Sequence, residues 1–318
     1  MTERPQVLFI SADRIGDAIM SIGAIREIGR QIPGAEITVA VGPTAAALFR
    51  AAPGVVKVIP WKKQKLSGHW RTLWRQTVGT KWAMVADVRG SAMSLFLRAK
   101  ERRLYSRALE KGEMKVVTFS NMMKAKQVAE PEIFLDDTAR ARADGIIGSN
   151  PAPIIAFAPI STAEDRSWPK DRWAGLIKKL MVEPRFDGWR FMVVGGPGDH
   201  DAAAPSLAVA GDRGIDFVGK GDILASAAAL SRASLFVGND SGLMHVSAAA
   251  GTPTLGLFGP SEWWHKAPWG PKGRVLAAAP VRGEFASILN LSVDQVCDEV
   301  LKLHESFAGA AKVATTAP

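Results

Sequence analysis

Short apolar segments alternate with helical segments along this chain of 318 residues, and that alternation restricts the fold more than any other feature. In the first part, apolar runs at 7–10, 36–41, 55–59 and 84–88 predict strands, and residues 19–32 have the apolar spacing of a helix. Strands that alternate with helices are typical of a parallel sheet with helices on its faces. The sequence therefore predicts an α/β fold.

A second series of the same kind begins near Pro151, and the chain has about twice the length of an average domain. We expect an N-terminal Rossmann-like domain at 1–150, a C-terminal one at 151–290, a closing amphipathic helix at 291–307 and a disordered tail at 308–318. The strands expected in the second series are 154–158, 191–194, 216–218, 235–238 and 254–257, and its helices are 170–181, 201–210 and 223–231. Two such domains imply a cleft between the carboxyl ends of their sheets, where ligands of open α/β folds bind.

The positive charge of the chain is concentrated in its first half. Of the net charge of +9, residues 1–150 contribute +10 and residues 151–318 contribute −1, while the segment 57–126 alone carries +13. Such a segment predicts an anionic partner, which could be a phosphorylated glycan or lipid, a membrane surface or a nucleic acid. Four tryptophans lie within it, either stacked on bases or sugars or buried in the core: Trp61, Trp70, Trp74 and Trp82.

Several other classes of protein are disfavoured by the sequence. It shows no signal-peptide pattern and no apolar stretch of about 18 residues, so we expect a cytoplasmic protein that contacts anionic membrane surfaces peripherally at most. With five dispersed histidines and the single Cys297, no bound metal and no cofactor are expected. The Walker, H-E-x-x-H and G-x-S-x-G motifs are absent.

Two polar loops that follow predicted strands carry candidate site residues. The first, Ser11-Ala-Asp-Arg-Ile-Gly-Asp17, places Asp17 at a helix start, either as a general base or as a helix cap alongside Asp13. In the second, at 159–173, the hydroxyls of Ser161 and Thr162 followed by Arg166 suit a diphosphate. The alternative for this second loop is an ordinary helix-start loop with buried tryptophans.

Two further segments carry the remaining candidates. In the glycine-rich turn at 194–201, Asp199 could hold a ribose hydroxyl or simply close the turn. In Asp240-Ser-Gly-Leu-Met-His245, a strand leads directly into a helix, whose free N–H groups and dipole form an anion site at Ser241 and Gly242. His245 taken alone is more simply a core histidine, but the whole segment up to Pro260 is too ordered for that explanation.

These motifs together resemble the bacterial lipopolysaccharide heptosyltransferases, glycosyltransferase family 9. The matching segments are Arg14-Ile-Gly-Asp17, the set Thr162, Arg166, Trp168 and Pro169, Gly195-Gly-Pro-Gly-Asp199, Asp240-Ser-Gly-Leu-Met-His245 and Leu257-Phe-Gly-Pro260. Arg166 replaces the family's Lys and Asp199 its Glu. The likeness spans both halves and is weakest between about 60 and 150.

The resemblance implies a GT-B fold with two Rossmann-like domains facing each other across a cleft. It implies an inverting, metal-independent transfer of a sugar, usually heptose from ADP-heptose, to an anionic lipid-linked glycan. Asp17 would be the general base on the acceptor hydroxyl. The donor would bind at Ser161, Thr162, Arg166, Asp199, Asp240, Ser241, Gly242 and His245.

The basic half is accordingly interpreted as the acceptor side, with Arg14, Lys62, Lys63 and Arg89 as acceptor-binding residues. Under this hypothesis the protein would work in the cytoplasm, at or near the cytoplasmic face of the inner membrane, and no nucleic acid is expected as a partner. Two other functions remain open. One is a sugar-nucleotide epimerase of GT-B fold, and the other is a non-enzymatic protein that binds polyanions or nucleic acids through 57–126.

Overall fold

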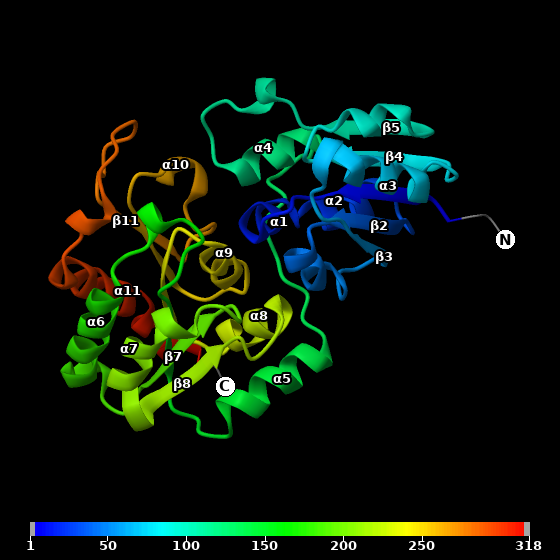
Figure 1. The fold of residues 1–318 in the computed structure, drawn as a ribbon. Coiled ribbons are helices and arrows are strands. Elements are labelled where there is room, and N and C mark those ends of the chain that lie inside the picture. Colours follow the sequence, from blue (N-terminus) through cyan, green and yellow to red (C-terminus); the bar gives the residue numbers. More distant parts are fainter. Residues whose placement is uncertain (1–3, 315–318) are drawn as a thin grey trace. The chain divides into compact units, whose positions relative to one another are not determined.

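The structure is a computed structural model that describes residues 4–314, with side chains up to Phe307 (Figure 1). The chain divides into two compact parts, residues 1–136 and 137–318, called unit 1 and unit 2 below. The division lies earlier than the predicted boundary at 150. Helix α5 (Asp137–Ile147) belongs to unit 2, because it packs against α8 (Ile223–Ser231) and pairs Asp144 with Arg232.

Unit 1 is a five-stranded parallel sheet in the order β3-β2-β1-β4-β5. Its strands are β1 (Gln6–Ile10), β2 (Glu36–Val41), β3 (Val55–Pro60), β4 (Trp82–Asp87) and β5 (Ala99–Leu104). Its α-helices are α1 (Ile15–Ser21), α2 (Ala24–Gln31), α3 (Gly68–Thr77) and α4 (Lys115–Met122). The 3₁₀ segments are η1 (Pro43–Phe49), η2 (Lys65–Ser67), η3 (Ala92–Phe96) and η4 (Arg107–Leu109).

The helix expected at 19–32 is in fact two helices, α1 and α2, separated at Ile22 and Gly23. The separation has a steric reason at Gly23. A Cβ there would lie 2.1 Å from the carbonyl oxygen of Ala129, so only glycine allows the chain segment at Ala129 to approach so closely. The continuous helix was therefore a wrong prediction, although its apolar face is buried as expected.

Unit 2 is a six-stranded parallel sheet in the order β11-β10-β9-β6-β7-β8. Its strands are β6 (Ile154–Ala158), β7 (Arg190–Gly195), β8 (Gly214–Val218), β9 (Leu235–Asn239), β10 (Thr254–Phe258) and β11 (Gly273–Ala277). Its other helices are α6 (Lys170–Val182), α7 (His200–Ala210), α9 (Gly242–Ala249), α10 (Trp263–Lys266) and α11 (Val293–Ala314). Its 3₁₀ segments are η5 (Glu164–Arg166), η6 (Pro184–Phe186), η7 (Gly211–Arg213) and η8 (Ile288–Asn290).

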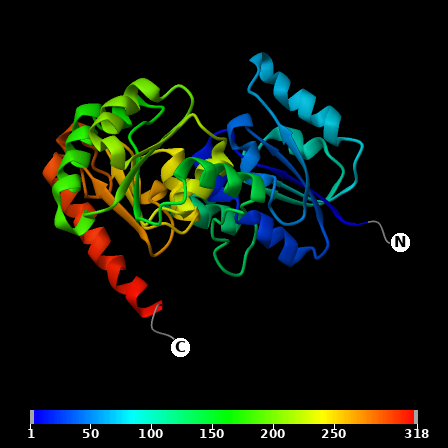
Figure 2. The ribbon, with the colours of Figure 1, turned by 90° about the horizontal axis from the view of Figure 1, so that it is seen from below.

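The closing helix α11 packs on the core of unit 2 through Val296, Val300 and Leu303, which are all buried. It is longer than the predicted helix at 291–307 and runs to Ala314, so the predicted disordered tail is helical in its first part. The rest of that tail, 315–318, lies outside the described residues. Figure 2 shows α11 as the long red helix at the margin of unit 2.

Both sheets have a crossover at which the chain changes the direction in which it adds strands. In unit 1, β2 and β3 lie on one side of β1, and β4 on the other. In unit 2, β7 and β8 lie on one side of β6, and β9 on the other. The loops after β1 and β4, and after β6 and β9, therefore diverge at the carboxyl edge of their sheet, where open α/β sheets bind ligands.

The single glycine of β10, Gly256, allows α9 to lie close to this sheet. A Cβ on Gly256 would lie 2.4 Å from Sδ of Met244, a buried residue of α9. Among residues 4–314, no helix combines the length and the apolar character needed to cross a membrane.

Candidate functional site

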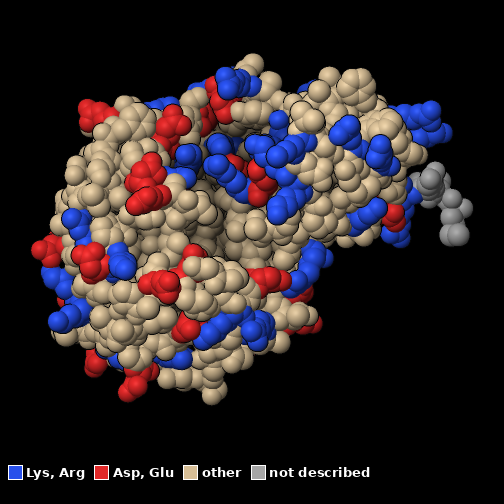
Figure 3. Space-filling model, viewed as in Figure 1, with Lys and Arg blue, Asp and Glu red and all other residues tan. Residues whose placement is uncertain are grey.

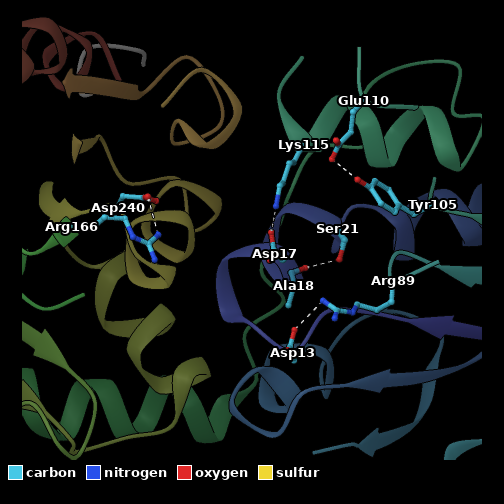
Figure 4. Close-up of polar contacts among 10 residues, drawn as sticks. All are labelled: Asp13, Asp17, Ala18, Ser21, Arg89, Tyr105, Glu110, Lys115, Arg166 and Asp240. Carbon is cyan, nitrogen blue, oxygen red and sulfur yellow. Dashed lines mark hydrogen bonds and ion pairs between the residues drawn. The ribbon is translucent and has the colours of Figure 1, made fainter. Parts of the chain in front are cut away.

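The loop after β1 and the first turn of α1 each present a carboxylate in an ion pair (Figure 4). Nζ of Lys115 lies 2.7 Å from Oδ1 of Asp17, and Nη1 of Arg89 lies 3.1 Å from Oδ1 of Asp13. The N-cap of α1 is Arg14, whose side chain makes no capping bond, and Asp17 lies in the first turn. The alternative that Asp13 or Asp17 serves as the N-cap residue is therefore wrong.

Arg89 is positioned by a buried carboxylate that the sequence analysis did not single out. Asp87, at the end of β4, is fully buried and accepts hydrogen bonds from the N–H groups of Arg89 and Ser91, at 2.8 and 2.9 Å. It also accepts hydrogen bonds from the hydroxyls of Ser91 and Ser94. These bonds fix the loop after β4, so that Arg89 reaches the loop after β1 at the crossover of the sheet.

The other predicted acceptor residues are exposed side chains at the same edge. Arg14 begins α1, while Lys62 and Lys63 follow β3, two strands away from β1. Trp61 links the two places, since it is buried and its ring lies 5.9 Å from the guanidinium carbon of Arg89. The structure thus brings Arg89 to Asp13 and, through Trp61, close to the two lysines.

Tyr105, directly after β5, is a further titratable group on this side of unit 1. Burial and the hydrogen bond that its hydroxyl donates to Glu110 raise the pKa of Tyr105 to about 12. The hydroxyl therefore stays protonated at neutral pH. The tyrosine is thus a hydrogen-bond donor, and the candidates for a general base near α1 are the carboxylates of Asp13 and Asp17.

In unit 2, Arg166 and Asp240 form an ion pair between the loops after β6 and β9 (Figure 4). Nη1 of Arg166 lies 3.1 Å from Oδ2 of Asp240, whose side chain is only 4% exposed against 22% for the arginine. The hydroxyl of Ser161 also donates to the backbone carbonyl of Asp240, at 3.4 Å. Thr162 is exposed in the same loop. Three of the predicted donor residues, Ser161, Arg166 and Asp240, are thus in direct contact.

Asn239, which sequence reasoning missed, holds these two loops together. It is fully buried at the end of β9, accepts a hydrogen bond from the N–H of Trp168 at 3.1 Å and donates one to the carbonyl of Pro159 at 2.9 Å. Its position directly before Asp240 was the only signal in the sequence. The side chain fixes both ends of the loop that carries Ser161 and Arg166.

The N-terminus of α9 has groups without hydrogen-bond partners in the described part of the chain. Ser241 is its N-cap and makes no capping bond, and its buried Oγ has no hydrogen-bond partner. Ser261, just after β10, has a second such buried hydroxyl. The hydroxyl of Ser241 and the N–H groups that begin at Gly242 form a site suited to an anion. His245 is buried within α9.

Asp199 lies after β7, next to β6 in the sheet. Its Oδ2 accepts a hydrogen bond from the N–H of Gly196 at 2.7 Å, which closes the glycine-rich turn. The side chain is partly exposed. The turn-closing interpretation is therefore confirmed for one of its oxygens, and the ribose contact stays a prediction.

Within residues 4–314, no group of three or more His, Cys, Asp or Glu side chains is arranged to hold a metal ion. The ion pairs at the carboxyl edge of each sheet join carboxylates to Lys or Arg side chains. Unit 1 presents a carboxylate held in place by a lysine. Unit 2 presents an arginine and a helix N-terminus, as a phosphate group requires.

Comparisons with known proteins agree with this geometry. The family model of glycosyltransferase family 9 (heptosyltransferase) matches residues 72–283, about two thirds of the chain. Lipopolysaccharide heptosyltransferase 1 of Pseudomonas aeruginosa is 25% identical over 81% of this chain and 79% of its own length.

Solved structures extend the likeness to nearly the whole chain. A glycosyl transferase of family 9 from Veillonella parvula has a TM-score of 0.80 and 18% identity, covering 95% of this chain and 98% of its own. The ADP-heptose lps heptosyltransferase II of E. coli has a TM-score of 0.76 and 21% identity, covering 94% and 98%. These matches confirm the predicted GT-B class of two-domain α/β fold.

The role of Asn239 can be tested by Asn239→Ala. The buried N–H of Trp168 and carbonyl of Pro159 would each lose a partner, at about 1–3 kcal/mol apiece, so we expect the free energy of unfolding to fall by about 2–6 kcal/mol. Urea unfolding measures it. The control is Asn290→Ala, an exposed asparagine of unit 2, which should change stability by less than about 0.5 kcal/mol. Equal stability of the two variants would contradict the assignment.

Proposed function

Because the chain belongs to glycosyltransferase family 9, the heptosyltransferases, we propose that it transfers heptose from ADP-heptose to an anionic acceptor of lipopolysaccharide type, with inversion at the anomeric carbon. The observation that carries the proposal is the Arg166–Asp240 pair beside the uncapped N-terminus of α9. The names of the E. coli and P. aeruginosa relatives support this donor and this class of acceptor.

The donor diphosphate would bind at the carboxyl edge of the sheet in unit 2. The guanidinium of Arg166 uses Nη1 for Asp240, which leaves further N–H groups for a phosphate oxygen. The N–H groups that begin at Gly242 and the hydroxyl of Ser241 can donate to the same group. Ser161 and Thr162 would add hydroxyl donors, and Asp199 would contact the ribose. The buried side chain of His245 would help to hold α9 in place.

Asp240 has a different part in this proposal, because its carboxylate carries the same charge as the diphosphate and has no proton to donate to it. Its charge is compensated by Arg166, and a carboxylate oxygen is a good acceptor for sugar hydroxyls. We therefore assign it to the donor sugar.

The acceptor would bind on unit 1, where Asp17 takes the proton of the attacking hydroxyl. Lys115 Nζ holds Oδ1 of Asp17, which orients the carboxylate and leaves Oδ2 for the acceptor. Arg14, Lys62, Lys63 and Arg89 supply positive charge around it. Among the charged residues in view in Figure 3, those of unit 1 are mostly Lys and Arg, and those of unit 2 are a mixture of both signs.

The reaction then follows from these groups. The acceptor oxygen attacks the anomeric carbon from the face opposite the diphosphate, its proton passes to Asp17, and the glycosidic bond to phosphate breaks. The leaving ADP gains negative charge in this step. Arg166 and the N-terminus of α9 stabilise that charge more strongly in the transition state than in the bound donor, which lowers the barrier.

The role of Asp17 can be tested by Asp17→Asn, which keeps the shape and removes the base. Acceptor-dependent release of ADP should fall by about 100- to 10,000-fold, while ADP affinity measured by calorimetry stays as in the wild type. The matched control is Asp13→Asn, the other ion-paired carboxylate of this loop, which should lose far less activity. Full activity of Asp17→Asn, or loss of ADP binding, would refute the role.

An incubation with donor alone separates transfer from epimerisation, since an epimerase converts the donor without an acceptor.

The diphosphate site can be tested with the double variant Arg166→Met, Asp240→Asn. Removing both charges avoids an unpaired buried carboxylate, so the protein should still fold. We expect calorimetry to show ADP binding weakened by about tenfold or more, because a charge-assisted hydrogen bond is lost.

The control for this experiment is Arg232→Met, Asp144→Asn, which removes an exposed ion pair elsewhere in unit 2. It should bind ADP like the wild type. If both double variants bind ADP with unchanged affinity, the diphosphate is not held at Arg166.

A further inference from the structure

An apolar groove of about 610 Å³ lies on unit 1 between α3 and η3. It is lined by Leu66, Trp70, Arg71, Trp74, Met93 and Phe96, with Ser67 and Ala92. The catalytic proposal above uses none of these side chains. The groove therefore needs an explanation of its own.

The rim of the groove exposes large apolar side chains to solvent. The exposed fractions are 93% for Leu66, 72% for Phe96 and 38% for Trp74, and the neighbouring Leu95 is 59% exposed. Leu66 and Ser67 also have φ angles of 51° and 56°, in the left-handed region that residues other than glycine rarely adopt. The backbone thus holds Leu66 outward at a conformational cost. The exposure of this large apolar side chain to water is also unfavourable unless another surface covers it.

Positive charge runs beside this apolar surface. On α3, Trp70 and Trp74 are one turn apart and line the groove, while Arg71 and Arg75 are one turn apart and exposed. The exposed Lys62, Lys63 and Lys65 come just before the helix, and the sequence has no Asp or Glu between Glu36 and Asp87. In Figure 2, α3 is the light-blue helix at the outer side of unit 1.

An apolar face bordered by Lys and Arg, with tryptophan at its edge, is the composition of segments that lie in the interface of an anionic bilayer. A second copy of this chain fits less well, because it would bring the same positive charge against the groove. Each Lys or Arg near anionic lipid strengthens binding about fivefold, and the exposed apolar side chains add insertion into the headgroup region.

The groove is connected to the proposed acceptor site by ring and charge contacts. The ring of Trp70 lies 5.2 Å from that of Trp61, and Trp61 lies under the guanidinium of Arg89, which pairs with Asp13. A surface docked on lipid at the groove would therefore lie next to the residues proposed to bind the acceptor.

We propose that η2, α3 and η3 dock on the surface of an anionic lipid bilayer, with Leu66, Trp74 and Phe96 inserted among the headgroups. Lys65, Arg71 and Arg75 then contact lipid phosphates, while Lys62 and Lys63 stay with the acceptor. The purpose of the docking, access to a lipid-linked acceptor, rests on the proposed function. The docking itself requires neither donor nor acceptor, so it can be tested separately.

The experiment is flotation of the full chain with vesicles of phosphatidylcholine alone or with about 30% phosphatidylglycerol. We expect binding to the anionic vesicles that weakens with salt, and at least about tenfold weaker partition for Leu66→Ser, Phe96→Ser and for Arg71→Gln, Arg75→Gln. The control Val182→Ser, Val281→Ser, which removes exposed apolar side chains of unit 2, should bind like the wild type. Calorimetry with ADP on every variant reports the donor site independently.

Three results would overturn the proposal. The first is no binding of the wild type to anionic vesicles, and the second is equal partition of the wild type and Leu66→Ser, Phe96→Ser. The third is self-association, or binding of single-stranded oligonucleotides, that the groove variants abolish while vesicle binding persists unchanged. Because the substituted side chains are exposed, melting temperatures close to that of the wild type are expected and serve as the check on folding.

Discussion

The crossover in each parallel sheet is the constraint on which the candidate site depends. Strands are added on one side of β1 and of β6 before the chain returns to the other side, so two loops diverge at each crossover. In unit 1 the pair formed by Asp13 and Arg89 spans these loops, and in unit 2 the pair formed by Arg166 and Asp240 does so. A buried polar side chain at a strand end fixes one loop of each pair through hydrogen bonds to its backbone. It is Asp87 in unit 1 and Asn239 in unit 2. An ion pair across the two loops at a sheet crossover therefore occurs in both units, and the charged groups around it differ between them.

The difference in chemistry follows the difference in charge. The net positive charge of the chain comes from its first half, and there it is spread over exposed side chains around Asp17 and the groove at α3. Such a field attracts a large anionic surface without fixing a single group. Unit 2 is close to neutral and instead directs one partly buried arginine and one helix N-terminus at a single position. A diphosphate needs a directed site of this kind. A charged glycan at a membrane is better served by the spread positive charge of unit 1.

Much of this could be predicted from the sequence, because apolar periodicity and turn residues are local signals. The helix 223–231 has the predicted bounds, and the loops after β1, β6 and β9 lie at strand ends as expected. Strand β5 was missed because it is a polar edge strand, AKERRL, without an apolar run. The pairing of Lys115 with Asp17, and the position of α5 in unit 2, depend on contacts between distant residues that no local pattern encodes. Arg166 was predicted as a phosphate ligand, and its pairing with Asp240 became visible only in the structure.

The central claim is that the donor diphosphate binds at the loops after β6 and β9 in unit 2, while unit 1 supplies the base. Hydrogen–deuterium exchange of the full chain with and without saturating ADP tests it most directly, since amides that gain a partner or lose mobility exchange more slowly. We predict slower exchange in residues 159–168 and 239–245, with no change in 11–17. Protection of residues 11–17 in place of those two segments would contradict the account.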